Sequence, residues 1–247
     1  MTPPWSADHP ALGTWVKVPT PEVVEILAGT GLDFLVLDGE HGTFDPRSLS
    51  TMISVARGHG TPAFVRVAGY APGDVQPALD AGAAGLFVPH VDSAAIARAV
   101  VGTCRFPPLG RRGASPNTRA GEWGRLDSKR YLAQGNDEVT LVAQLESPEA
   151  VGEADKIAEV PGIDAVFIGA YDLAVSAGVE PGGEAARAMV HQAEARCRAS
   201  SLSFGGVAFS GSEAGELLGR GHHFVMVGSD VAFLGRSVRD TVSEVRG

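Results

Sequence analysis

The chain has little cysteine and a shortage of basic residues. Its two cysteines, Cys104 and Cys197, stand far apart and match no metal-binding or redox spacing, so we expect two buried free thiols. The 20 lysines and arginines are outnumbered by 29 aspartates and glutamates, which gives a formal net charge of −9. This balance argues against nucleic acid as a partner, because phosphate binding relies on lysine and arginine. Any site for an anion must therefore be locally basic.

Long apolar runs and several common motifs are also absent. No stretch of 18 or more apolar residues occurs, so no membrane span is expected. The start of the chain lacks a basic stretch followed by an apolar one, which argues against a secretory signal. There is no P-loop, no GxGxxG after a first strand and no GxSxG nucleophile context. We therefore expect a cytoplasmic protein without a membrane partner.

What the sequence does have is a regular alternation of apolar runs with helix-like segments. We predict strands at 13–18, 33–40, 62–68, 85–91, 139–147, 164–170, 204–210 and 222–230. The helix-like segments between them include 21–31, 74–82, 93–104, 147–160 and 184–201. Eight strands alternating with helices in 247 residues predict an α/β fold, a (β/α)8 TIM barrel that spans 1–247 as a single domain.

Two connections are longer than this pattern requires. Segment 106–127 is irregular, rich in arginine and contains tryptophan, and a loop of this length in a compact domain is usually functional or disordered. We interpret it as a functional lid. Segment 176–185 reads as a plain surface excursion.

Two apolar runs each end with one acid: LVAQLES (141–147) with Glu146, and AVFIGAYDL (165–173) with Asp172. If the runs are neighbouring parallel strands, their carboxyl ends lie roughly 5 Å apart. Two carboxylates that close repel each other unless a cation or a proton sits between them. A hard divalent metal accepts oxygen ligands from such a pair and leaves positions open for a substrate.

Strand alternation predicts which side chains point into the barrel. In 141–146, the apolar set at alternate positions suits packing against helices, which turns Gln144 and Glu146 inward. The same alternation along the second and third predicted strands points five further side chains inward: Val36, Asp38, Glu40, Phe64 and Arg66. Polar residues thus collect at the carboxyl ends of strands two, three, five and six, where barrel enzymes carry their sites.

Each of these residues has a structural alternative. Asp172 could cap a helix that starts at Leu173, and Glu146 could be a solvated acid just before the helix cap Ser147. Taken together, the two acids favour the metal. Arg66 could pair with an internal acid for structure alone, or a substrate carboxylate could give it a bidentate partner.

The histidines and lysines near strand ends bear on the chemistry. His41 follows Asp38 and Glu40, so it is either a surface loop histidine or a base oriented by one of these carboxylates. His90 ends a strand but has no acid nearby in the sequence. None of the predicted strand ends carries a lysine, since Lys17 falls within strand one, so a metal rather than a Schiff base would serve as electron sink.

Six motifs, in the expected order, carry a family resemblance: DFLVLDGEH, PAFVRV, LDAGAAGLFVPHV, RFPPLGRRG, LVAQLES and IDAVFIGAYDL. They resemble the HpcH/HpaI aldolase family, the class II pyruvate aldolases, over essentially the whole chain. The resemblance implies a β/α barrel that binds Mg²⁺, Mn²⁺ or Co²⁺ through Glu146 and Asp172. Pyruvate would chelate the metal through its carboxylate and keto oxygen.

The resemblance also implies roles for the other residues. Arg66 would contact the keto or enolate oxygen, and His41 would be the catalytic histidine with Asp38 as its orienting partner. Backbone N–H groups of Gly169 and Ala170 would bind the substrate carboxylate. Five further residues are candidates for the surroundings of the site, among them the lid-loop arginine: Glu40, Asp80, His90, Arg112 and Gln144. Asp80, near a helix end, could instead reach a neighbouring subunit or an arginine.

Family members commonly form homohexamers as trimers of dimers, with the C-terminal helix exchanged between subunits and the sites completed by a neighbour. Two departures from the family pattern are visible. Where members often read GPxDLS, this chain reads GAYDLA (169–174), which keeps Asp172 but loses a proline and a serine. His90 occupies a position that varies in the family, so substrate preference could shift there.

The implied function is cleavage of a 4-hydroxy-2-oxo acid into pyruvate and an aldehyde, and the reverse condensation, by a carbon–carbon lyase. An oxaloacetate decarboxylase or an enolate-condensing biosynthetic enzyme would use the same site. A lyase acting on coenzyme A esters is less favoured, because no adenine or pyrophosphate pocket is readable. A non-catalytic protein that binds oxo acids is also less favoured, because such a protein would have no need of a base such as His41.

Overall fold

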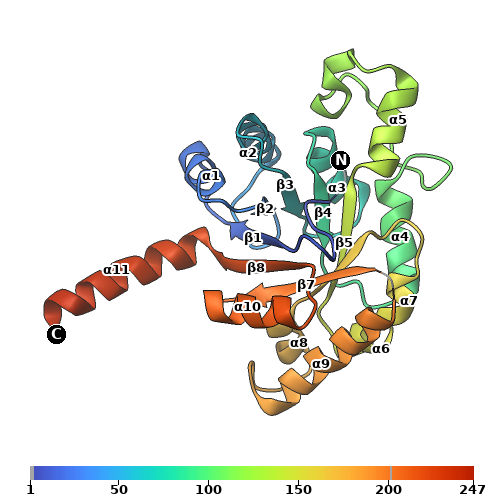
Figure 1. Ribbon diagram of the computed structural model, residues 1–247. Coiled ribbons are helices and arrows are strands. Elements are labelled where there is room, and N and C mark those ends of the chain that lie inside the picture. Colours follow the sequence, from blue (N-terminus) through green and yellow to red (C-terminus); the bar gives the residue numbers. More distant parts are fainter. Residues whose placement is uncertain (1–2, 201) are drawn as a thin grey trace.

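Eight short apolar runs form parallel strands that close into a barrel in the order β1 to β8 (Figure 1). The computed structural model describes residues 3–200 and 202–247. The strands are β1 (Ala11–Val16), β2 (Phe34–Asp38), β3 (Ala63–Arg66), β4 (Gly85–Val88), β5 (Thr140–Leu145), β6 (Ala165–Ile168), β7 (Ser203–Ala208) and β8 (Phe224–Ser229). The predicted barrel and all eight predicted strands are confirmed, with ends that differ by a few residues.

Helices surround the barrel and fill most connections between strands. They are α1 (Pro21–Ala28), α2 (Pro46–Gly58), α3 (Pro72–Asp80), α4 (Ala94–Cys104), the 3-10 helix η1 (Arg119–Gly124), α5 (Ser128–Asp137), α6 (Pro148–Gly152), α7 (Ala154–Ala158), α8 (Ala170–Ser176), α9 (Glu184–Ala199), α10 (Gly211–Gly219) and α11 (Asp230–Arg246). The predicted helix 147–160 is two short helices that meet at Glu153, directly after Gly152, a residue with poor helix propensity. No helix in the described part of the chain is long and apolar enough to cross a membrane.

Alternation along the strands divides the core into two layers. One set of side chains, such as Leu35 and Val65, packs between the barrel and its helices, where the free thiols of Cys104 and Cys197 are also buried. The other set fills the barrel and is largely aromatic, with Trp5 stacked on Phe224 at a ring separation of 4.2 Å. Trp5 precedes β1, so the amino ends of the strands are sealed by apolar rings. The polar inward positions lie at the opposite, carboxyl ends.

The segment between α4 and α5 lies away from those carboxyl ends. Helix α4 returns the chain toward the amino ends of the strands, and α5 leads directly into β5. The prediction that 106–127 is a lid over this chain's own site is therefore wrong. Arg112 is buried, stacks on Phe106 at 4.5 Å and donates to Asp80 at 3.1 Å. Asp80 thus pairs with an arginine, and neither residue belongs to the surroundings of the site within this chain.

The C-terminal helix α11 extends away from the barrel (Figure 1). Of its residues only Asp230, at the first position, is buried. One face of α11 carries a row of exposed apolar side chains at helical spacing: Val231, Leu234, Val238, Val242 and Val245. The segment 176–185 is mostly exposed, as predicted for a surface excursion.

Candidate active site

Asp38 and Arg66 form a buried ion pair at the carboxyl ends of β2 and β3, where the sheet register places them side by side. Arg66 donates from Nε to Oδ1 of Asp38 at 2.9 Å and from Nη2 to Oδ2 at 2.6 Å. Burial alone would raise the pKa of Asp38, but hydrogen bonds from Arg66 and Lys17 outweigh it and hold the pKa at about 2. Asp38 is therefore ionised throughout the neutral range, and Arg66 has the internal acid partner considered above.

Lys17 is the site residue that the sequence prediction missed. Strand β1 ends at Val16, so Lys17 stands at the mouth of the barrel, and its Nζ contacts Oδ2 of Asp38. The expectation that no strand end carries a lysine is wrong, because the predicted strand ran two residues too far. Trp15 lies inside the barrel, and the same alternation would have pointed Lys17 inward.

Glu40 and His41 follow Asp38 in a turn that the Asp38 carboxylate holds. Oδ1 of Asp38 accepts backbone N–H groups from His41 at 3.0 Å and from Glu40 at 3.3 Å. Nη1 of Arg66 lies 3.3 Å from Oε2 of Glu40, and Nε2 of His41 lies 3.9 Å from the same oxygen. Asp38 thus contacts the backbone of His41 and not its imidazole, because its oxygens already serve Arg66 and Lys17. Glu40 is the carboxylate beside the imidazole.

Glu146, directly after β5, is 4% exposed, so it is not a solvated strand-end acid. Its Oε2 accepts the backbone N–H of His90 at 3.1 Å, and its Oε1 accepts from Nε2 of Gln144. Burial raises the pKa of Glu146, and the negative charges of Asp172 and Glu40 add to that effect. The site therefore concentrates negative charge around one buried carboxyl group.

Asp172 does not cap a helix. Helix α8 begins at Ala170 after the cap residue Gly169, no side chain caps it, and Asp172 lies in its first turn. Asp172 comes from a helix rather than a strand end, but its charge still acts on Glu146. The N–H of Gly169 donates to the carbonyl oxygen of Leu145 at 3.1 Å and is therefore not free for a substrate, which corrects one of the two predicted backbone donors. The other, Ala170, opens the helix, where N–H groups lack partners within the helix.

His90 follows β4 in a left-handed backbone conformation, with φ of 56°. Such a conformation is unfavourable for a residue other than glycine and often occurs at functional sites. Its Nδ1 lies 3.6 Å from Oε2 of Glu146, and its Nε2 lies 3.7 Å from Oε1 of Glu40. The acid partners that the neighbouring sequence lacks thus come from two other strands.

The donor set at the mouth fits a hard divalent cation. Carboxyl groups outnumber cationic side chains there: Asp38, Glu40, Glu146 and Asp172 accompany Lys17 and Arg66. Oε1 of the buried Gln144 has no hydrogen-bond partner among the described residues. Within residues 3–200 and 202–247, no three His, Cys, Asp or Glu side chains are arranged as a complete metal site. Two carboxylates, Glu146 and Asp172, are the candidates for such a cation, and its further positions would be left to water and substrate.

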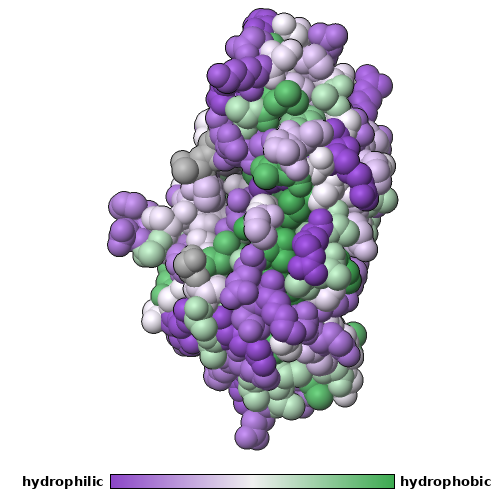
Figure 2. Space-filling model, turned by 90° about the vertical axis from the view of Figure 1, so that its right-hand side faces the viewer, coloured by the Kyte–Doolittle hydropathy of each residue, from purple (hydrophilic) through white to green (hydrophobic). Residues whose placement is uncertain are grey.

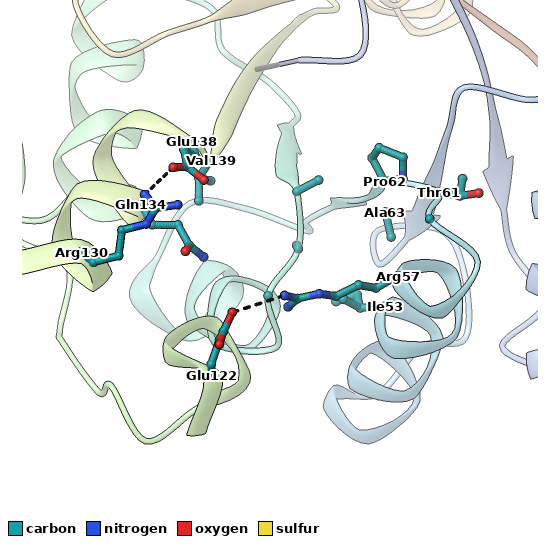
Figure 3. A pocket seen from close by; sticks show the side chains of 14 residues that line it. Ile53, Arg57, Thr61, Pro62, Ala63, Glu122, Arg130, Gln134, Glu138 and Val139 are labelled. Atoms are coloured by element: carbon teal, nitrogen blue, oxygen red, sulfur yellow. Dashed lines mark hydrogen bonds and ion pairs between the residues drawn. The ribbon is translucent and has the colours of Figure 1, made fainter. Parts of the chain in front are cut away.

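A cavity of about 350 Å³ lies elsewhere, at the amino ends of β3, β4 and β5. Figure 2 views the molecule from the side of α4 and α5, where apolar residues form a strip between hydrophilic ones. Figure 3 shows Arg57 of α2 reaching toward Glu122 of η1 across this cavity, and Arg130 toward Glu138. Its charged side chains pair with one another, and its lining contains none of the predicted site residues. We therefore assign the site to the carboxyl ends of the strands.

Comparisons with known proteins agree with the fold and identify the family. Residues 11–236 match the family model described as HpcH/HpaI aldolase/citrate lyase. A hydroxypyruvate/pyruvate aldolase of Chromohalobacter salexigens is 34% identical over 95% of this chain and 93% of its own length. A 2-keto-3-deoxy-L-rhamnonate aldolase of Salmonella gallinarum is 36% identical over 89% of this chain and 82% of its own length.

A solved structure of an HpcH/HpaI aldolase/citrate lyase family protein from Burkholderia cenocepacia superimposes with a TM-score of 0.90 at 30% identity. The match covers 96% of this chain and 95% of that one. Both the sequence and the fold therefore agree over nearly the full length. This chain belongs to the HpcH/HpaI aldolase/citrate lyase family.

Proposed function

We propose that the protein is a class II aldolase that cleaves and forms 4-hydroxy-2-oxo acids, with pyruvate and an aldehyde as the two fragments. The observation that carries this proposal is the environment of Glu146. Glu146 is buried beside Asp172 and Glu40, so burial and repulsion raise its pKa, and a bound cation would relieve both effects. The aldolase relatives support the reaction type, and the oxygen-rich mouth supports a metal-dependent form of it.

Glu146 and Asp172 would hold the cation, which we expect to be Mg²⁺, Mn²⁺ or Co²⁺ because carboxylate oxygens suit hard divalent ions. The chemistry that such a cation supplies is Lewis-acid polarisation of the oxo acid, in place of a Schiff base. Gln144 would orient Glu146 through its amide nitrogen, and its unpartnered Oε1 would accept a hydrogen bond from a bound water or substrate.

Arg66 would stabilise the negative charge that grows on the enolate oxygen. Its guanidinium has five N–H donors, and three of its nitrogens face Asp38 and Glu40, which leaves donors for a further anionic oxygen. The guanidinium carbon lies 4.4 Å from the centre of the Trp15 ring, a cation–π contact that helps to hold the group in place. A donor that is fixed before the reaction begins is worth about 3 kcal/mol to the transition state.

His41 is our candidate for the base that removes the C4 hydroxyl proton during cleavage. Its side chain is 60% exposed at the mouth, so it can approach a substrate held between Arg66 and the paired acids. Glu40, beside the imidazole, would stabilise the protonated form after the transfer. Ala170, at the start of α8, would contribute its N–H to the oxo-acid carboxylate.

Removal of the metal tests the proposal. Exhaustive chelation should abolish cleavage and condensation, and Mn²⁺ or Co²⁺ should restore them. Full activity after chelation, together with borohydride trapping of pyruvate on Lys17, would contradict the proposal and indicate a Schiff-base enzyme. An assay with oxaloacetate, in which CO₂ release is compared with aldehyde-dependent product, separates aldol chemistry from decarboxylation.

Arg66→Lys tests the role of the arginine while keeping a positive charge beside Asp38. Lysine lacks the planar fork of donors, so kcat should fall by about 100-fold. Arg196→Lys is the matched control, because Arg196 makes a half-exposed pair with Asp155 on α7, away from the mouth. Equal activities of the two variants would exclude Arg66 from the reaction.

We further propose that α11 is exchanged between subunits of a homo-oligomer, with a trimer of dimers as the expected form. Its apolar row is exposed and is not covered by any other residue that the structure describes. Burial of such a row against a second copy would stabilise the helix in the way that packing stabilises other amphipathic helices.

A further inference from the structure

Lys17 occupies a defined position in a row of charged side chains at the mouth. The register pairs Trp15 with Val36 on β2, so Lys17 stands level with Asp38, and Asp38 is paired with Arg66 on β3. The row therefore reads cation, anion, cation across three neighbouring strands. Asp230 fixes the backbone at this point, since its carboxylate accepts the N–H groups of Lys17 and Val18 at 2.9–3.0 Å.

The Asp38 carboxylate has enough hydrogen-bond donors without Lys17. It already accepts two hydrogen bonds from Arg66 and two from backbone N–H groups, which is enough for a buried acid. An ammonium has three donors, and the contact with Asp38 engages one. Lys17 thus brings a positive charge beyond what the structure of the ion pair requires.

Lys17 is also the more accessible of the two cations. Its side chain is 29% exposed, whereas that of Arg66 is 9% exposed and faces both Asp38 and Glu40. In the closed barrel β1 lies four strands from β5 in either direction, so Lys17 and Glu146 stand on opposite sides of the mouth. An oxo acid held near Glu146 would leave its reaction partner on the side of Lys17.

We propose that Lys17 determines acceptor specificity, by selecting aldehydes that carry an anionic group, a carboxylate or a phosphate, at the end remote from the carbonyl. This inference rests on the proposed aldolase function and adds the substrate class to it. The positive charge of Lys17 matters because carboxyl groups outnumber cations at the mouth and the chain as a whole carries −9, so anions are repelled at long range. A charge-assisted hydrogen bond from Lys17 to the anionic group would offset that repulsion.

Two pairs of aldehydes of matched length test the inference with pyruvate and Mn²⁺. Butanal is compared with succinic semialdehyde, and glyceraldehyde with glyceraldehyde 3-phosphate, so that the carboxylate and phosphate forms are measured separately. In at least one pair, the wild type should have a kcat/KM for the anionic aldehyde that is about tenfold or more higher than for the neutral one. Lys17→Met should remove most of that preference, and Lys17→Arg should retain it.

The ratio within each pair is the decisive measurement, because any common loss of enolate formation cancels. If Lys17 serves only to hold Asp38, Lys17→Met slows both members equally and the ratio stays unchanged, which overturns the inference. Lys156→Met, which removes a lysine from an exposed pair with Glu153 on the surface, is the matched control and should leave the ratio as in the wild type.

The wild type alone also tests the inference if the methionine variant does not fold. Its preference for the anionic aldehyde should shrink as NaCl is raised to about 0.5 M, because salt screens partly exposed charges. A wild type that prefers neutral aldehydes in both pairs overturns the role of Lys17. Absence of methyl-proton exchange from pyruvate in D₂O overturns the aldolase proposal itself, whereas exchange with an unchanged ratio overturns only this inference.

Discussion

Gly169 lies so close to Glu146 that a methyl group on Gly169 would stand 2.8 Å from Cγ and 3.1 Å from Oε1 of the glutamate. The backbone of Gly169, with φ of −82°, suits any residue, so the lack of a side chain is what this contact requires. Gly169→Ala should therefore displace the Glu146 carboxylate and lower the affinity for Mn²⁺ by about 10- to 100-fold, the range seen when the support of a metal ligand is disturbed. Titration calorimetry with Mn²⁺ measures it.

The matched control for this change is Gly215→Ala in α10. A Cβ at Gly215 would meet nothing within 4 Å, so this variant should bind Mn²⁺ like the wild type and be slightly more stable. Equal Mn²⁺ affinities of the two variants would mean that Glu146 is not a ligand. Circular dichroism of both variants establishes that the barrel is intact.

A second prediction concerns acid stability and follows from Asp38. Its pKa is about 2 in the folded protein against an ordinary value of 3.8, so the folded state holds the ionised form more firmly than the unfolded state does. The stability from this group is fully present above about pH 4 and is lost as pH falls toward 2. The difference corresponds to roughly 2 kcal/mol in the free energy of unfolding.

Asp38→Asn removes this titration. Urea unfolding between pH 5 and pH 2.5 should show a smaller loss of stability with falling pH in the variant than in the wild type, whatever their absolute stabilities. Parallel curves would contradict the assignment of the low pKa to Asp38.

Most of the fold could be predicted because it depends on periodicity. Alternation correctly assigned Val36 and Phe64 to the barrel interior. The lid was placed wrongly because the makeup of a loop does not reveal which end of the barrel it occupies. The order of elements does, since a loop between α4 and α5 precedes a strand rather than following one.

The sequence predicts those site residues whose position depends on a single strand end. Asp38, Arg66 and Glu146 all stand at strand ends and point inward, as alternation requires. Contacts between strands were out of reach, which is why the acid partners of His90 went unseen. Lys17 was missed for another reason: a boundary error of two residues moved it from the mouth of the barrel into a strand.

A third prediction concerns the two cysteines. Burial raises the pKa of Cys104 and of Cys197 to about 12, so both stay protonated and inaccessible in the folded protein. A thiol reagent such as DTNB at pH 8 should find no reactive thiol in the native protein and two after unfolding in guanidinium chloride. Cys104→Ala should leave one thiol in the unfolded protein, and a fast-reacting thiol in the native wild type would show that one of the buried sites opens.

The last prediction concerns the apolar row on α11. Leu234 is 68% exposed and Val238 is 54% exposed, and together with Val231, Val242 and Val245 they form one face of a helix that leaves the barrel. An apolar row of this kind is costly in water and typical of a surface that another chain covers.

Leu234→Lys places a charge in the middle of the row and should shift the protein toward smaller species. Ser243→Lys introduces the same charge on the opposite face of α11, near the C-terminus of the helix, where a cation is favourable, and should leave the assembly unchanged. Light scattering coupled to size-exclusion chromatography measures both masses. A monomeric wild type, or equal masses for the two variants, would mean that the row on α11 is not an interface between copies of this chain.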